Sequence, residues 1–132
     1  MSEGCLFVLA NGTDNKLLEF VYPTKLSGNM VPINTKSLLG RAFLSKRNYI
    51  SNNLKKEKNF LALNYLMDMG LSPVQKVVTY PVEFGGRIIA VLEVVRRGDS
   101  LTEAPDFGKE DLKRISGVID KIFSLRVAAE TG

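Results

Sequence analysis

The stretch Thr79–Arg97, TYPVEFGGRIIAVLEVVRR, constrains the fold of this chain more than any other segment. Its Gly85-Gly86 pair is typical of a two-residue turn between antiparallel strands, so the stretch predicts a β-hairpin. The second strand is apolar on both faces up to Glu93, as in a strand that is covered on both sides. Pro81 has no N–H to donate, so we expect a bulge or a missing neighbour beside it. The sequence therefore predicts a central hairpin that carries a buried glutamate.

The rest of the chain supplies strands and helices around this hairpin. Cys5–Ala10 is also apolar on both faces and predicts a second central strand, which returns through an Asn-Gly turn over Lys16–Pro23. Further patterns predict a loop over Lys25–Pro32, a helix within Asn34–Asn48, an edge strand at Asn48–Ser51, a helix over Lys55–Gly70, a loop over Arg97–Asp111 and a long helix over Lys109–Glu130. Hairpin connections make the sheet mainly antiparallel, with helices on its two faces.

Composition excludes several classes of chemistry. The 132 residues include no histidine, which excludes a Ser–His or Cys–His nucleophile pair and histidine-ligated zinc or haem. A single cysteine permits no internal disulfide and favours a cytoplasmic location. No apolar run is long enough to cross a bilayer. The net charge of +4 comes from short basic clusters without a nucleic-acid-binding motif, so we expect no nucleic-acid or membrane partner.

Three segments carry a family likeness. Ser37–Asn52 combines a glycine-centred helix with an edge strand, Val77–Arg97 combines a proline-containing strand with a Gly-Gly turn and its partner strand, and Asp106–Ser116 leads through a phenylalanine into the last helix. In this order they resemble a GAF domain, the small-molecule-sensing module of phytochromes, cyclic-nucleotide phosphodiesterases and bacterial signalling proteins. The resemblance implies an α+β, GAF/PAS-like (profilin-like) fold, with a central antiparallel sheet of five or six strands between helices.

The resemblance also implies a function. We expect residues 1–132 to form a single GAF domain of a larger signalling protein, without the N-terminal helix that family members usually have. We expect this domain to have no catalysis of its own. The rival is a small enzyme of the same fold, which would need a nucleophile or a metal cluster in a chain that has no histidine and one cysteine. The expected domain binds a small molecule, cyclic-nucleotide-like or another metabolite, in a pocket roofed by Ser37–Ser72, and passes the change through its C-terminal helix to other domains. The alternative is a ligand-free dimerisation or protein-interaction module whose pocket is filled by its own side chains.

The candidate ligand-binding residues are aromatic and polar groups on the predicted sheet and its covering helices. Aromatic rings would stack on a flat ligand, and polar groups would fix its orientation. The carboxylate of Glu93, which corresponds to a strand glutamate that faces the ligand in some relatives, would accept hydrogen bonds from a purine edge. Each of these groups has plain core packing as its alternative. The set is Phe43, Asn53, Phe60, Tyr65, Thr79, Tyr80 and Glu93.

A structural motif follows the central strand. Arg97, Phe107 and Asp111 match the Lys, Phe and Asp of the cyclic-nucleotide-binding phosphodiesterase motif, whereas Arg96 and Leu112 depart from it. The alternative is an Arg97–Asp111 ion pair that fixes the loop, with Phe107 packed in the core. We favour this alternative because buried charges are usually paired.

The remaining expectations concern cofactors and partners. Cys5 lies in an apolar strand and is expected to pack in the core. The bilin-binding and methionine-sulfoxide-reducing branches of the family need histidines or further cysteines, so we expect no bilin, haem or metal. The last helix carries an apolar stripe that predicts a homodimer contact. Its residues are Leu112, Ile115, Ile119 and Ile122.

Overall fold

A computed structural model describes residues 2–10, 16–56 and 72–131 of the chain. The strands in these residues are β1 (Ser2–Leu9), β2 (Leu17–Tyr22), β3 (Met30–Pro32), β4 (Tyr49–Ser51), β5 (Val74–Phe84) and β6 (Arg87–Arg97). The helices are α1 (Leu38–Ser45) and α3 (Lys109–Thr131), with short 3₁₀ turns η1 (Thr24–Leu26) and η2 (Leu54–Lys56). No described helix is both long enough and apolar enough to cross a membrane.

The six described strands form one antiparallel sheet in the order β3-β2-β1-β6-β5-β4. Strand β6 lies between β1 and β5, and this confirms the central position predicted from its two apolar faces. Its partner β5 joins it through Gly85 and Gly86, whose φ values of 61° and 80° suit glycine. The hairpin at the centre of the sheet is therefore the one that the sequence predicts.

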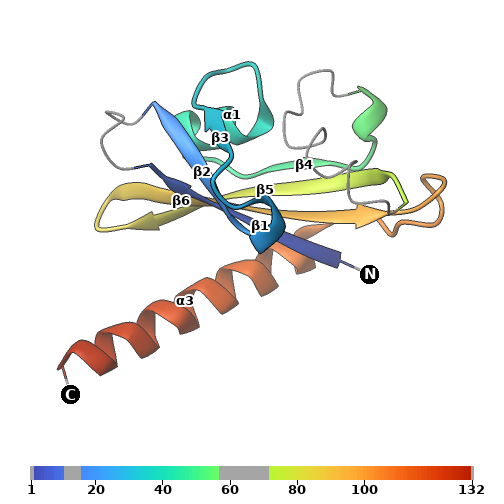
Figure 1. Cartoon of the computed structure of the whole chain (residues 1–132). Helices are drawn as coiled ribbons and strands as arrows, with labels where there is room; N and C mark the ends of the chain where they lie inside the picture. Colours follow the sequence, from blue (N-terminus) through green and yellow to red (C-terminus); the bar gives the residue numbers. More distant parts are fainter. Residues whose placement is uncertain (1, 11–15, 57–71, 132) are drawn as a thin grey trace.

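Helices cover the sheet on both faces. Figure 1 shows α1 on one face and α3 on the other, which confirms the predicted α+β architecture. The main apolar cluster lies on the α1 side, where Leu38, Leu39 and Ala42 of the helix are buried. The sheet contributes Cys5, Phe7, Leu18, Phe20, Val77, Val91 and Val95 to the same cluster. Alternation along each strand therefore divides the sheet into an α1 side and an α3 side.

The start of α1 is fixed by two local features. The Ser37 hydroxyl caps the helix by accepting a hydrogen bond from the Gly40 N–H at 3.0 Å. A Cβ atom on Gly40 would lie 1.8 Å from the carbonyl oxygen of Asn34. No side chain fits in this space, so Gly40 lets the chain before α1 fold back against the helix.

Pro81 lies where the outer edge of β5 loses its neighbour. Strand β4 pairs with β5 only from Val77 to Thr79, and the register between β5 and β6 shifts between Val82 and Glu83. Since proline has no N–H for a ladder, the absence of β4 beside Pro81 costs no hydrogen bond there. The predicted interruption is confirmed.

Two segments differ from the prediction or lie beyond it. The predicted loop Lys25–Pro32 contains β3, which pairs with β2 at the edge of the sheet. The segment contains Gly28 and Asn29 and lies between Pro23 and Pro32, and these turn residues favoured a loop over a strand. The helix predicted over Lys55–Gly70 falls mostly on residues 57–71, outside the described part of the chain. The same applies to the candidate site residues Phe60 and Tyr65.

Candidate functional site

Thr79 and Glu93 face each other in the centre of the sheet. They are direct partners in the β5–β6 ladder, and both are 0% exposed. Both side chains point to the α1 side, since they alternate in step with the core residues Val77, Val91 and Val95 of the same strands. The structure thus brings two of the predicted ligand-binding residues together on one surface.

The polar atoms of this pair have no hydrogen-bond partner within the described structure. The unpartnered atoms are the Thr79 hydroxyl oxygen and both carboxyl oxygens of Glu93. Leaving a buried polar group unpaired costs about 1–3 kcal/mol, so native proteins pair nearly all of them. Burial also raises the pKa of Glu93 well above its ordinary value. Burial therefore favours the uncharged carboxylic acid form of Glu93 over the carboxylate.

Cys5 adds a third side chain to this row. It is the β1 partner of Glu93 and is 2% exposed, as the prediction of a core cysteine requires. Burial first, and then the neighbouring Glu93, raise the pKa of its thiol to about 12. Cys5 is consequently an uncharged thiol that packs as a small apolar side chain.

Tyr80 lies on the other face of the sheet. Consecutive strand residues point to opposite sides, so Thr79 and Tyr80 do not line one pocket, and the prediction that grouped them is wrong. Tyr80 instead lines a cleft of about 360 Å³ beside α3, together with Ser116 and Ile119 of that helix. Its hydroxyl belongs to the α3 side of the molecule.

Phe43 and Asn53 also lie apart from the Thr79–Glu93 pair. Phe43 is half-buried and packs against the core cluster on the α1 side. Asn53 lines an open hollow of about 700 Å³ with Lys76 and Asp106, and its buried side-chain oxygen has no hydrogen-bond partner among the described residues. The predicted set is thus spread over more than one place in the fold.

The predicted ion pair uses a different arginine. Arg96 binds Asp111, with 2.9 Å between Nη2 and Oδ1, whereas Arg97 binds Glu3 on β1, with 2.6 Å between Nε and Oε2. The reason is again alternation, because Arg96 points to the α3 side and Arg97 to the opposite side. The guanidinium of Arg96 also lies 4.0 Å from the ring centre of Phe107, which is buried as predicted.

Two further polar residues, which were not predicted from the sequence, help Arg96 to hold the segment before α3 against the sheet. Lys76 is buried, and its Nζ donates to the Ala104 carbonyl and to Asp106, each at 2.5 Å. Asn52 donates to the Phe107 carbonyl at 3.1 Å and accepts from the Phe107 N–H at 2.8 Å. The sequence signal for a buried, paired lysine was the position of Lys76 within the apolar stretch Val74–Val78. Asn52, Lys76 and Arg96, hereafter the loop-fixing residues, hold the segment Ala104–Asp111 against the sheet.

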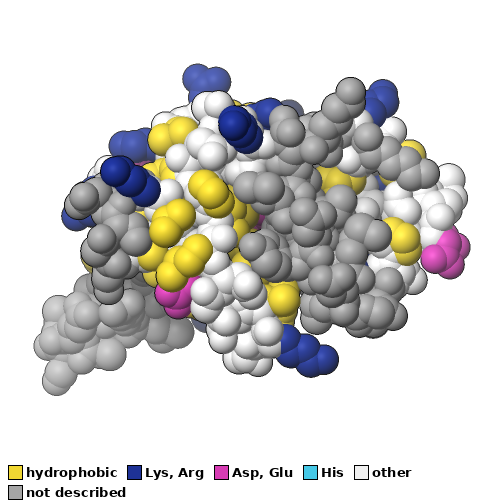
Figure 2. Space-filling model, turned by 45° about the horizontal axis from the view of Figure 1, so that its top comes forward, with side chains coloured by type: hydrophobic (Ala, Val, Ile, Leu, Met, Phe, Trp, Pro, Cys, Tyr) yellow, Lys and Arg dark blue, Asp and Glu magenta, His cyan; other side chains and the backbone are white. Residues whose placement is uncertain are grey.

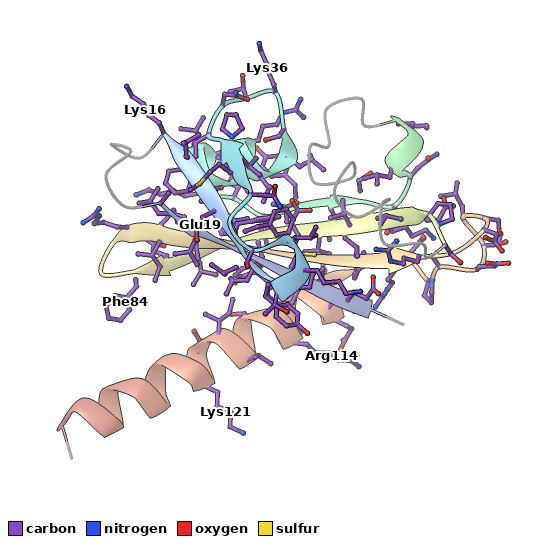
Figure 3. The ribbon with its side chains drawn as sticks, in the orientation of Figure 1. Lys16, Glu19, Lys36, Phe84, Arg114 and Lys121 are labelled. Carbon is purple, nitrogen blue, oxygen red and sulfur yellow. The ribbon has the colours of Figure 1, made fainter. Side chains whose placement is uncertain are left out.

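The predicted dimer residues lie along α3. Leu112, Ile115 and Ile119 are half-buried, and the Ile122 side chain lies outside the described part. The neighbouring Val118 is 58% exposed. Figure 3 shows Arg114 and Lys121 of the same helix on the side away from α1. The helix thus presents both apolar and basic groups to solvent.

Comparison with known proteins identifies the fold. No protein-family model matches the sequence, and no curated protein is similar to it in sequence. Solved structures do match. The GAF domain of a phosphoenolpyruvate-protein phosphotransferase from Coxiella burnetii has a TM-score of 0.69 at 10% identity, covering 98% of this chain and 73% of that one. Residues 122 to 287 of a methyl-accepting chemotaxis protein give a TM-score of 0.70 at 15% identity, covering 95% and 77%.

An enzyme shares the same architecture. Type II free methionine-R-sulfoxide reductase from Thermoplasma acidophilum has a TM-score of 0.60 at 17% identity, covering 88% of this chain and 72% of that one. At these identities the likeness shows the fold alone. The chain has a GAF-like α+β fold, which is found in domains of signalling proteins and in this reductase.

Proposed function

We propose that this chain is a non-catalytic, cytoplasmic sensory domain of a signalling protein. It binds a small molecule on the α1 side of the sheet, at Thr79 and Glu93, and passes the change through α3 to a neighbouring domain. The observation that carries the proposal is the three buried polar atoms of this pair without partners in the described structure. A ligand that supplies the missing hydrogen bonds offsets their cost.

A non-catalytic role is supported by the chemistry of the residues. The chain has no histidine, and its one cysteine carries a pKa raised to about 12 by burial. A thiol with that pKa is a poor nucleophile because the thiolate is the reactive form. Binding, rather than bond-breaking, is therefore the work that this site is equipped to do.

Signalling requires that the ligand distinguish two states of the domain. A ligand shifts an equilibrium only by its difference in affinity for the two states. The β5–β6 hairpin connects the site to α3, because Glu93 lies three residues before Arg96 on β6 and Arg96 binds Asp111 of the helix. A small shift of β6 on ligand binding therefore reaches the first turn of α3 directly.

The experiment is a thermal-shift screen with cyclic nucleotides, amino acids and 2-oxo acids. A ligand at a hundredfold excess over its Kd stabilises the folded chain by about 2.7 kcal/mol. That stabilisation should disappear in Thr79→Val, which keeps the shape of the side chain, and persist in Tyr80→Phe, whose hydroxyl lies on the other face. A ligand whose effect is the same in both variants, or a screen without any stabilising compound, contradicts the proposal.

A second candidate function is self-association through α3. It is favoured by Val118, which is 58% exposed beside the half-buried Ile115 and Ile119. On this hypothesis the domain is a ligand-free dimerisation module. Sedimentation velocity over a hundredfold range of concentration should then show a dimer that Val118→Lys dissociates, together with melting temperatures that no compound in the panel changes.

A further inference from the structure

The Thr79–Glu93 pair also restricts the chemistry of its ligand, on the premise that the proposed function is correct. Four described elements surround the pair: β1, the β5–β6 hairpin, α1 and β4. Strand β4 contributes Tyr49, the ladder partner of Thr79, whose hydroxyl lies 3.2 Å from the Ser45 hydroxyl oxygen. Their side chains on this side of the sheet decide whether a charged ligand is matched by an opposite charge. They also decide which hydrogen bonds remain for the ligand to make.

The described surroundings offer no charge to a ligand at this point. Strand β1 presents Cys5, an uncharged thiol, and α1 buries only Leu38, Leu39, Gly40 and Ala42. On β6, Arg97 is four residues beyond Glu93 and its guanidinium is bound by Glu3 and by the Ser72 carbonyl. Figure 2 shows Lys and Arg side chains around the margin of this face. An anionic ligand would thus meet a carboxyl group that has no neighbouring cation among the described residues.

The pair itself offers a definite hydrogen-bonding pattern. A protonated carboxyl group presents an O–H donor and a carbonyl acceptor side by side, and the Thr79 hydroxyl adds a group that both donates and accepts. A planar ligand edge with an N–H beside a carbonyl oxygen or ring nitrogen is complementary to this carboxyl group. The two then form a pair of parallel hydrogen bonds in which neither partner carries a charge.

A cationic ligand is the competing possibility. It would lose its hydration on entering the apolar core and would convert Glu93 to the carboxylate, with release of a proton. Burying two charges costs several kcal/mol for each ion, and their attraction offsets that cost only with further hydrogen bonds. The apolar neighbours Val77, Val91 and Val95 supply none from their side chains. An uncharged partner avoids this cost.

We propose that the Thr79–Glu93 pair binds an uncharged ligand through a planar lactam or amino-azine edge, with Glu93 as the protonated partner. The ligand places its N–H against the Glu93 carbonyl oxygen and its acceptor against the Glu93 O–H. The lactam of guanine and the amino-pyrimidine edge of adenine both have this pattern, as do simpler heterocycles. Recognition depends on the hydrogen-bonding edge, and a net charge on the ligand weakens binding.

The test uses four planar probes of similar size: 2-pyridone, N-methyl-2-pyridone, benzamidine and benzoate. Binding to the whole chain is followed by NMR chemical-shift changes and by calorimetry. We expect 2-pyridone to bind at least about tenfold more tightly than the N-methyl compound, which lacks the N–H donor. Benzamidine, a cation, and benzoate, an anion, should bind more weakly than 2-pyridone. The reverse order for either charged probe overturns the proposal.

Two variants of Glu93 distinguish the binding of an uncharged ligand to the protonated carboxyl group from the binding of a cation to the carboxylate. Glu93→Gln keeps one donor and one acceptor on the same planar group, so 2-pyridone should retain its affinity within about threefold. Glu93→Leu removes both and should lower the affinity at least about tenfold, and Thr79→Val gives an independent measure of the same pair. Loss of binding in Glu93→Gln, or no loss in Glu93→Leu, contradicts the lactam edge.

Proton exchange supplies a further measurement. Calorimetry in two buffers of different ionisation enthalpy should give the same binding enthalpy for 2-pyridone, since Glu93 keeps its proton. Release of one proton per ligand shows a cationic mode and overturns this inference. If a ligand from the metabolite panel stabilises the chain through Thr79 while 2-pyridone does not bind, the ligand class is wrong and the sensory function stands. If neither binds, both fail.

Discussion

Arg96 and Asp111 join the end of the central strand to the first turn of the last helix. Nη2 of Arg96 lies 2.9 Å from Oδ1 of Asp111, and the other carboxylate oxygen accepts the Gly108 N–H at 2.9 Å. Asp111, in the first turn of α3, thus caps the N-terminus of its own helix, as the acidic residue of a capping box does. The same carboxylate caps a helix and attaches that helix to the sheet.

Replacement of Asp111 by alanine should remove both contacts. Because the side chain is largely shielded from water and binds an arginine and a helix N–H, we expect the free energy of unfolding to fall by about 1–2 kcal/mol. Urea denaturation at neutral pH measures this difference. Asp120→Ala, at an exposed position of the same helix, is the matched control and should change the stability by less than about 0.5 kcal/mol. Equal effects of the two substitutions would show that Asp111 does not hold α3.

The contribution of Asp111 should also depend on pH. The hydrogen bond from Gly108 first, and then the charge of Arg96, lower the pKa of Asp111 below its ordinary value of 3.8. A carboxylate with a lowered pKa in the folded state stabilises fully above its unfolded pKa and loses this effect as the pH falls through the folded one. The stability difference between the wild type and Asp111→Asn should therefore be constant above about pH 5 and shrink below pH 4. A difference that grows in acid contradicts this assignment.

Glu93 should show the opposite dependence. Its pKa is raised in the folded state, so folded chains hold an extra proton above the ordinary value of 4.5, and stability falls as the pH rises. Glu93→Gln has no such proton. We expect the wild type and Glu93→Gln to have similar free energies of unfolding at pH 4.5. Above pH 4.5 the variant should become more stable than the wild type by up to about 1.4 kcal/mol per pH unit, until the pH reaches the pKa of Glu93 in the folded state. Denaturation curves at pH 4.5, 6 and 7.5 measure this, and a constant difference would show that Glu93 is ionised when folded.

Gly40 and Gly117 give a matched pair of glycine substitutions in helices. A Cβ on Gly40 would meet the Asn34 backbone at 1.8 Å, so Gly40→Ala must move the chain before α1 and should cost about 2 kcal/mol or more. Gly117 in α3 has open space around it, and Gly117→Ala should stabilise the chain by about 1 kcal/mol through helix propensity. Thermal melts of both variants test the contrast. A neutral Gly40→Ala would show that the backbone approach is looser than described.

The sequence predicted those parts of the fold that depend on local pattern. Apolar residues on both faces placed β6 in the centre, and the Gly85-Gly86 pair marked its turn. Strand β3 was not predicted because the turn residues Gly28 and Asn29 and the flanking prolines made its segment look like a loop. The sequence predicted Arg97, not Arg96, as the partner of Asp111. That prediction used only the position of Arg97 after the strand and did not take into account which face of the sheet each arginine points to.

The site was predicted only in part for a similar reason. Thr79 and Glu93 were both proposed, but nothing in the sequence shows that they are ladder partners, since strand register depends on the whole hairpin. Tyr80 was grouped with Thr79 because both are able to contact a ligand, although neighbours on a strand point to opposite faces. Lys76 was missed because its partners, Ala104 and Asp106, lie in a distant loop.

The loop-fixing residues Asn52, Lys76 and Arg96 hold only one end of α3. The helix has 23 residues, about 34 Å at 1.5 Å per residue, and its C-terminal part leads away from the sheet (Figure 1). In the proposed signalling role, the helix would tilt about its fixed start near Gly108. A tilt of about 10° at that point would carry the far tip through about 6 Å for a helix of that length. On that proposal, a displacement small enough to preserve the packing of β6 would become several times larger at the tip of α3.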